Sequence, residues 1–246
     1  IRNPLQWSDA RGMVFGVLVV IAATALLGWL ARPALAPAAL RHASSVQCAF
    51  RFNSYILLAL SQRLAGTEGL ALCAVCIGTA VPVCNLLAVS AMARHSRAGL
   101  LTEWSRNPLI LATVAGLIGA AAGLRLPEPA DTLLARLGAA ALALGLMTVG
   151  AGIRLTGLIG DRRLVVWITA VKLVAGPLAA LAAAHWLGLG PAARTVLVIF
   201  GAVPTASAAY VLANRMGGDG PFVALCVTAS TLVAALTLPL WLALLL

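Results

Sequence analysis

The sequence predicts an all-α polytopic membrane protein built from inverted five-helix repeats with broken crossover helices. Hydrophobic residues form 62% of the 246-residue chain and charged residues only 10%, whereas a soluble domain carries about 25% charged residues. The mean hydropathy is +1.02, and apolar runs of about 20 residues, enough to cross the hydrocarbon core, recur along the whole chain. The third observation is a pair of matched polar clusters inside two of these runs.

Eight apolar runs are expected to span the membrane, and the short loops between them make neighbouring helices antiparallel. The expected spans cover residues 13–30, 47–65, 69–93, 107–124, 132–153, 163–187, 192–213 and 220–246. The first span ends near Trp29 and the sixth near Trp186, as is typical of tryptophan at a membrane interface. The second and seventh spans carry the polar clusters. Glycine-bearing turns at 66–69 and 217–220 separate them from the third and eighth spans.

The arginines lie singly or in small groups between the apolar runs, which indicates a topology signal and not a nucleic-acid partner. Alternating the loops assigns to one side Arg32, Arg41, Arg51, Arg94, Arg97, Arg106, Arg154, Arg162, Arg163 and Arg215. The other side receives Arg2, Arg11, Arg63, Arg125, Arg136 and Arg194. The first side has more arginines, so it is expected to be cytoplasmic, with both ends of the chain outside.

Residues 51–81 align without a gap with residues 202–232, with few identities but the same layout. In each, a polar cluster within a span is followed by an apolar stretch, a glycine-bearing turn and another span. The first copy, 1–93, holds three spans; after a cytoplasmic linker at 94–106, the second copy, 107–246, holds five. An odd number of spans inverts the second copy in the membrane, as in secondary transporters. Equal copies would place two more spans before the first residue given.

The polar clusters are the expected substrate site, because inverted-repeat transporters bind at mid-depth where two interrupted helices cross. Half-helix N-termini there suit an anion, and Pro204 would free a carbonyl group one turn earlier. The candidate substrate-binding residues of the two clusters are Asn53, Ser54, Tyr55, Pro204, Thr205, Ser207 and Tyr210. The alternative is that the hydroxyl groups join helices and Pro204 is a tolerated kink.

Lys172, the only lysine, lies near the middle of the span 163–187. An ammonium group at that depth is costly unless it is paired or faces water, so Lys172 is a further candidate. It would balance an anionic substrate, occupy the place of a coupling cation or take part in a proton-linked step. The alternative is an ammonium group that reaches the interface. No cofactor is expected, and coupling to H⁺ or Na⁺ stays open.

Pro82 and Asn85 are expected to interrupt the span 69–93, and Asn85 either pairs with a neighbouring helix or lines the site. Hydroxyl groups in the equivalent part of the last span are further candidates: Thr228, Ser230 and Thr231. The five cysteines, which include the pair Cys73 and Cys76, are expected to pack as small apolar residues and to form neither a metal nor a redox site.

Several stretches resemble the auxin efflux carrier family, which includes bacterial permeases for malonate and other organic anions and is similar to the plant PIN-type auxin carriers. The clearest are RFNSYILLAL from residue 51, KLVAGPL from residue 172 and VPTASAAYVLANRMGGDGPFVALCVTASTL from residue 203. The resemblance, over about residues 45–246, implies ten spans, two inverted bundles and a carboxylate site that includes Asn53, Lys172, Pro204 and Thr205. The chain departs from the family near Leu60, where the plant carriers have a crossover proline.

The repeat and the resemblance together predict a secondary transporter of a small organic anion that works by alternating access in the bacterial cytoplasmic membrane. It would contact the lipid bilayer, and a homodimer is an open alternative. One rival is a scaffold or sensor on the same fold that does not transport. The other is an intramembrane hydrolase with Ser207 as nucleophile and His185 as base. His185 is expected at the interface and no Gly-x-Ser-x-Gly motif is present, so no catalytic residue is expected.

Overall fold

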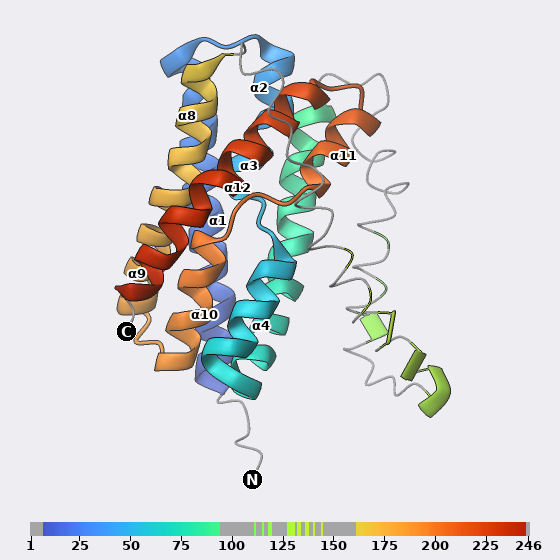
Figure 1. Ribbon diagram of the computed structural model, residues 1–246, viewed down its shortest axis with the longest axis vertical. Helices are drawn as coiled ribbons and strands as arrows, with labels where there is room; N and C mark the ends of the chain where they lie inside the picture. Colours follow the sequence, from blue (N-terminus) through green and yellow to red (C-terminus); the bar gives the residue numbers. More distant parts are fainter. Residues whose placement is uncertain are drawn as a thin grey trace.

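The computed structural model describes residues 7–93 and 161–244, with scattered residues between 111 and 144. All regular structure in these described parts is helical (Figure 1). The principal elements are α1 (Trp7–Leu35), α2 (Ala39–Ser45), α3 (Gln47–Phe50), α4 (Ser54–Ala93), α8 (Arg162–Ala170), η1 (Val171–Ala175), α9 (Gly176–Trp186), α10 (Pro191–Ala202), α11 (Ala208–Arg215) and α12 (Gly220–Ala243). The expected linker at 94–106 and most of the spans 107–124 and 132–153 lie outside the described residues.

Four helical segments within the described residues are long and apolar enough to cross a membrane. They are Asp9–Leu35, Ala39–Ala93, Arg162–Trp186 and Gly220–Ala243, and Pro191–Ala202 is a shorter apolar helix. Large apolar side chains cover the outer surface as well as the core: Phe15 is 60% exposed and Leu236 is 75% exposed. A surface of this kind fits hydrocarbon better than water, and the expectation of an all-α polytopic membrane protein is confirmed.

Helix α4 contains a sharp turn at Gly66, whose φ of +58° is a backbone conformation that glycine adopts without steric cost. The chain reverses there, so α4 consists of two helices (Figure 1). The turn lies where the sequence separates the second and third spans. The expectation that Pro82 and Asn85 interrupt the third span was wrong, because Gly66 is the only residue of α4 with non-helical dihedral angles. Membrane helices tolerate an internal proline where neighbouring groups accommodate the freed carbonyl group.

The first broken span begins earlier than expected. Helices α2 and α3 are separated only by a turn at Val46, so the helical path runs from residue 39 to residue 50 before the break at 51–53. The sequence obscured this start, because the segment is polar. Two of its buried polar groups donate to backbone carbonyl groups: the Ser44 hydroxyl donates to the Leu40 carbonyl at 2.7 Å, and Nε2 of Gln47 donates to the Ala209 carbonyl at 3.3 Å. The break therefore lies near the middle of the span, not in its first part.

The path through α8, η1 and α9 is continuous and contains one π-helical turn at Val171–Ala175. Pro177 has no N–H group to donate to the carbonyl of Leu173 four residues earlier. The indole Nε1 of Trp241, on α12, donates to that carbonyl instead at 2.8 Å. The Gly176 N–H group donates to the carbonyl oxygen of Val171, five residues earlier, as in a π-helical turn. π-Bulges of this kind are frequent at functional sites, and this one contains Lys172.

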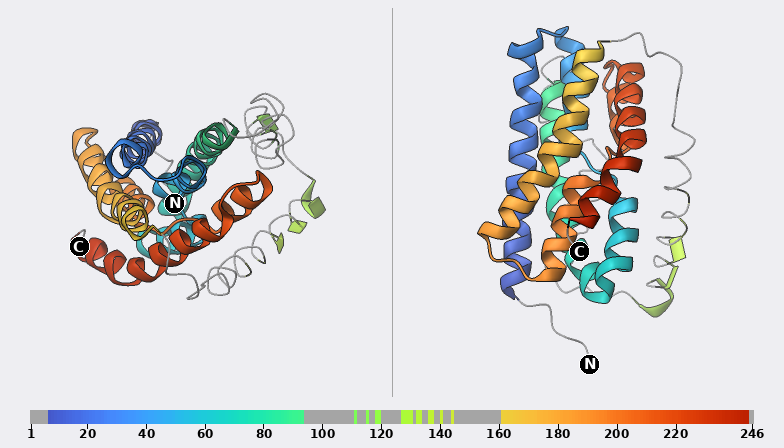
Figure 2. Two further views of the ribbon diagram at one scale, coloured as in Figure 1. Left: turned by 90° about the horizontal axis from the view of Figure 1, so that it is seen from above. Right: turned by 60° about the vertical axis from the view of Figure 1, so that its left-hand side comes forward.

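Two interrupted segments cross near the middle of the bundle (Figures 1 and 2). The segment α2–α3–α4 and the segment α10–α11 run in opposite directions (Figure 1). Helix α1 packs against α4, α9 and α10, and α12 packs against α8 and α11. The opposite directions agree with an inverted repeat, which stays a prediction because most residues between 94 and 160 are outside the described parts.

Candidate functional site

The two interruptions are in direct contact. The Asn53 N–H group donates to the carbonyl oxygen of Pro204 at 2.8 Å. The Thr205 hydroxyl donates to the carbonyl oxygen of Cys48 at 2.6 Å. The rings of Phe52 and Phe200 pack edge to face, with centroids 4.8 Å apart. Hydrogen bonds and ring packing therefore fix the position of each break against the other.

The first break ends because Asn53 caps the helix that follows. Its side-chain Oδ1 accepts from the N–H groups of Tyr55 at 3.1 Å and Ile56 at 3.2 Å, as an N-cap residue does. Arg51 precedes it with extended dihedral angles, φ −68° and ψ 148°. Asn53 is 2% exposed. Its amide oxygen thus stabilises the start of α4.

The second break begins at Val203, which is extended with φ −65° and ψ 147°, as expected for a residue that precedes proline. Pro204 has no N–H group for the carbonyl of Phe200. The ammonium of Lys172 donates to that carbonyl at 3.4 Å and to the carbonyl of Gly201 at 3.1 Å. Lys172 is 2% exposed. It therefore stabilises the C-terminal end of α10, where free carbonyl groups favour a cation.

A cavity of about 170 Å³ lies beside the crossing. Its lining combines residues of the first break, the second part of α4 and the start of α11: Arg51, Phe52, Ser54, Val81, Cys84, Asn85, Ala206 and Ala208. No Asp or Glu is in this set. Ser207, which directly precedes helix α11, makes no side-chain cap hydrogen bond to it, so the positive end of the α11 dipole is uncapped beside the cavity-lining residues Ala206 and Ala208.

Arg51 supplies the charge of this cavity. Its guanidinium donates from Nη2 to Oδ1 of Asn85 at 2.8 Å. The residue is 6% exposed, and its Nε is buried without a hydrogen-bond partner within the described parts of the chain. A buried N–H group without a partner is costly. A bound carboxylate, which accepts from a guanidinium in paired geometry, would satisfy it.

Arg51 corrects one sequence expectation. The sequence predicts that the arginines, Arg51 among them, lie at the membrane surfaces, but Arg51 is buried at the crossing. Sequence reasoning missed it as a site residue because arginines close to the end of an apolar run are typical topology signals, and Arg51 lies only four residues inside the expected span 47–65. The useful signal is its position two residues before Asn53, the residue that caps the second half of a broken helix.

Seven of the sequence-predicted site residues fall into two groups. Ser54 and Asn85 line the cavity with Arg51. Others hold the crossing together, because they bond to backbone or to each other: Asn53, Lys172, Pro204, Thr205 and Ser230. Ser230 accepts from the Thr205 N–H group at 3.3 Å and donates to the Val227 carbonyl at 2.9 Å.

Three predicted residues are less central. Ser207 precedes the first turn of α11, and Tyr55 is in the first turn of α4; both are half-buried. Tyr210, also half-buried, packs against the apolar cluster that includes Ala209 and Phe222. None of the three lines the cavity at Arg51. Their part in substrate binding stays a prediction.

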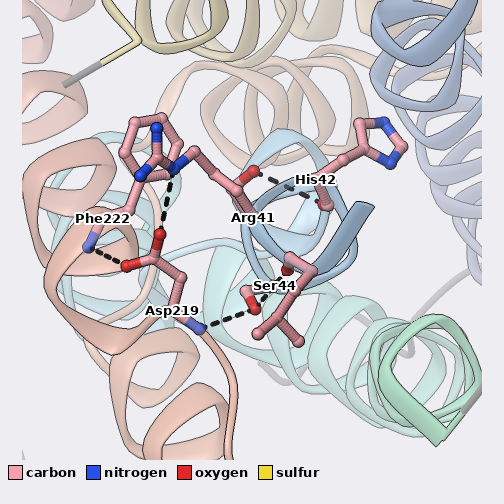
Figure 3. A network of polar contacts seen from close by, with 7 residues as sticks. Arg41, His42, Ser44, Asp219 and Phe222 are labelled. Atoms are coloured by element: carbon pink, nitrogen blue, oxygen red, sulfur yellow. Dashed lines mark hydrogen bonds and ion pairs between the residues drawn. The ribbon is translucent and has the colours of Figure 1, made fainter. Parts of the chain in front are cut away.

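A polar tie joins the start of the first broken segment to the start of α12 (Figure 3). Nε of Arg41 contacts Oδ2 of Asp219 at 3.0 Å, and the guanidinium lies 5.0 Å from the ring centroid of Phe222. Oδ1 of Asp219 accepts from the Phe222 N–H group at 3.1 Å and so caps α12. The Asp219 N–H group donates to the Ser44 hydroxyl at 2.9 Å. The tie fastens α2 to α12 at one face of the bundle.

A protein-family model described as a membrane transport protein matches residues 32–242. The chain belongs to this family. It is the auxin efflux carrier family, so the resemblance seen in the sequence is confirmed. The match starts within α1 and ends in α12, and it includes both breaks, Arg51 and Lys172. No curated protein matches the chain. Membership of the auxin efflux carrier family supports a membrane transport role, and this is a family of transporters and not of enzymes.

Proposed function

We propose that the protein is a secondary transporter of a small organic anion, and that the carboxylate binds in the cavity at Arg51. The observation that carries this proposal is the Arg51 guanidinium, which is buried at the crossing of two broken helices with one N–H group unpartnered. Arginine is the residue best suited to hold a carboxylate, because its planar fork donates two parallel hydrogen bonds.

The surroundings of Arg51 favour a negative charge. The uncapped N-terminus of α11 reaches the same cavity through Ala206 and Ala208, and its dipole adds partial positive charge. Ser54 lines the same cavity and carries a hydroxyl group, and Oδ1 of Asn85 accepts from the guanidinium and fixes its position. An anion would therefore meet one full charge, one helix end and one neutral hydroxyl donor.

The two broken segments also suggest how the anion would cross. In secondary transporters the binding site lies at mid-depth between two rigid bodies that rock around it. We propose alternating access of this kind in a bacterial cytoplasmic membrane. The face with the Arg41–Asp219 tie would be cytoplasmic, since the last turn of α1 and the first turns of α2 and α8 place arginines there.

The test uses the purified full chain, in detergent for thermal unfolding and in proteoliposomes for uptake, with malonate, succinate and benzoate as probes. We expect at least one probe to raise the melting temperature of the wild type, and Arg51→Gln to abolish both this rise and the uptake of that probe. Arg51→Lys should keep part of the effect, because it retains the charge but not the fork. Arg63→Gln is the matched control, since Arg63 is exposed on α4 and does not line the cavity.

A folded Arg51→Gln protein with unchanged carboxylate binding would overturn the assignment of the site. A scaffold or sensor on this fold predicts a different pattern, in which the wild type takes up none of the three probes while their binding is retained. The hydrolase alternative has little support from the geometry, because His185 is exposed in the last turn of α9 whereas Ser207 is half-buried directly before α11. Labelling of the purified protein by a serine-reactive probe would revive it.

A further inference from the structure

Lys172 holds a position that is distinct from the anion cavity. Its ammonium lies within 3.1 Å of the Gly201 carbonyl and 3.4 Å of the Phe200 carbonyl, which belong to the last turn of α10. It also lies 5.8 Å from the centroid of the Phe200 ring. No carboxylate forms an ion pair with Lys172 among the described residues. Its partners are therefore carbonyl dipoles and an aromatic face.

The backbone is shaped to bring these groups together. Gly201 and Gly176 approach so closely that a Cβ atom added at Gly201 would lie 2.8 Å from the Gly176 carbonyl oxygen. Because side chains are absent at both positions, the end of α10 meets the end of η1 directly. The π-helical turn at Val171–Ala175 changes the direction of the side chains in this stretch. Lys172 can then reach across to α10, one turn before the contact between the two glycines.

The end of a broken helix is a cation site in transporters of this architecture. Unwound carbonyl groups and the negative ends of half-helices coordinate Na⁺ in secondary transporters with interrupted helices. Here the equivalent groups, the carbonyls of Phe200 and Gly201, already accept from a covalently attached ammonium. A cation on a side chain neutralises the helix end but cannot leave with the substrate.

We propose that Lys172 is a tethered cation that replaces a mobile coupling ion at the end of α10, so that this crossing needs no bound Na⁺. The role of Lys172 as a cation is independent of the proposed function. Only its consequence, anion transport that does not depend on Na⁺, rests on the proposed function. Lys172 is then a positioning residue: it holds α10 and Pro204 in place, and Pro204 in turn holds Asn53 at the start of α4.

The first test is the thermal unfolding of the full chain in detergent, without any carboxylate, at equal ionic strength in choline, sodium or n-propylammonium chloride. The wild type should melt at the same temperature in all three salts. Lys172→Ala should melt at a lower temperature in choline chloride. n-Propylammonium, which replaces the deleted atoms, should raise its melting temperature by about 3 °C or more, and Na⁺ should give a smaller rise in the same direction.

The matched control is Leu173→Ala. Leu173 is the next residue of η1 and is 1% exposed, so its truncation also leaves a hole but removes no charge. It should lose thermal stability and show no response to either cation. Rescue of Lys172→Ala alone separates a cation site from a packing defect.

Two results would overturn the proposal. One is a folded Lys172→Ala protein that responds to neither cation. The other is a wild type that Na⁺ stabilises over choline, and this result requires no variant to fold. In proteoliposomes, replacing Na⁺ by choline should leave wild-type uptake of the carboxylate probe unchanged. Since the unfolding arms contain no carboxylate, their outcome is independent of the Arg51 experiment, and the two proposals can fail separately.

Discussion

The N–H group of Asn53 donates a 2.8 Å hydrogen bond to the carbonyl oxygen of Pro204, so the two interrupted segments are joined through main-chain atoms. Both atoms would be without a helical partner at a break, and each satisfies the other. The contact lies between the Lys172 contact with α10 and the cap of α4. Substitutions at the Lys172 contact or at the α4 cap are therefore expected to affect the stability of the whole crossing.

Thr205→Val tests the second bond of the crossing. The Thr205 hydroxyl donates to the Cys48 carbonyl at 2.6 Å, and the residue is 1% exposed. Loss of this donor leaves a buried acceptor unpaired, which should lower the free energy of unfolding by about 1–3 kcal/mol. Thr205→Ser should be milder. Thr231→Val is the control, because the Thr231 hydroxyl bonds within its own helix; an equal loss in thermal or denaturant unfolding for both variants would contradict the prediction.

Asn53→Ala removes the cap of α4. We expect a loss of about 1 kcal/mol in the free energy of unfolding, because the N–H groups of Tyr55 and Ile56 lose their acceptor. Asn53→Ser should restore most of it, since serine is also a good N-cap residue. Denaturant unfolding of the three proteins measures the effect. A serine variant as unstable as the alanine variant would show that Asn53 acts otherwise.

Gly201→Ala should be strongly destabilising, while Gly78→Ala should not. A Cβ atom at Gly201 would meet backbone atoms of Gly176 and Pro177, which cannot move aside as a side chain can. Nothing lies within 4 Å of a Cβ atom at Gly78, inside α4, so alanine there should stabilise the helix by about 0.5–1 kcal/mol. Melting temperatures that shift in the same direction for both variants would refute the close approach of the backbone at Gly201 to the backbone at Gly176.

Asp219→Ala should cost more stability than Arg41→Ala. The two side chains are 24% and 38% exposed, so their ion pair contributes about 0–1 kcal/mol and should weaken in high salt. Asp219 additionally caps α12 through its carboxylate, and loss of this cap alone costs about 1 kcal/mol. The hydrogen bond from its main-chain N–H group to the Ser44 hydroxyl is retained in the alanine variant. Unfolding at low and high salt gives both values. An equal loss in the free energy of unfolding for the two substitutions would contradict a stabilising role of the Asp219 cap.

Much of the fold could be predicted because apolar runs of membrane-spanning length indicate the helices, and single glycine, proline and lysine residues within or between them indicate turns, breaks and buried charge. The turn at Gly66, the break at Pro204 and the path through Lys172 each depend on a residue type whose backbone or charge has few alternatives. The region of α2 could not be predicted in this way. Ser44 and Gln47 are polar residues that membrane burial disfavours, and their acceptability depends on partners distant in sequence, such as the Ala209 carbonyl.

The candidate site was less visible than the crossing that holds it. The sequence indicated the residues that break or cap helices, because those roles follow from residue type. It indicated Lys172 as a site candidate and assigned Arg51 to a membrane surface, whereas the structure places Lys172 against the end of α10 and Arg51 at the cavity. Only the three-dimensional packing decides which of the two cations meets carbonyl groups and which one has an unpaired N–H group.

Because the contact between the two breaks is a main-chain hydrogen bond, it affects how the sequence of this protein can evolve. The Asn53–Pro204 hydrogen bond is available to any pair of residues that adopts the same dihedral angles, so mutation can alter the neighbouring side chains without dismantling it. Substitutions at cavity positions such as Ser54 can therefore change which substrate is preferred, while the main-chain contact at the crossing is kept.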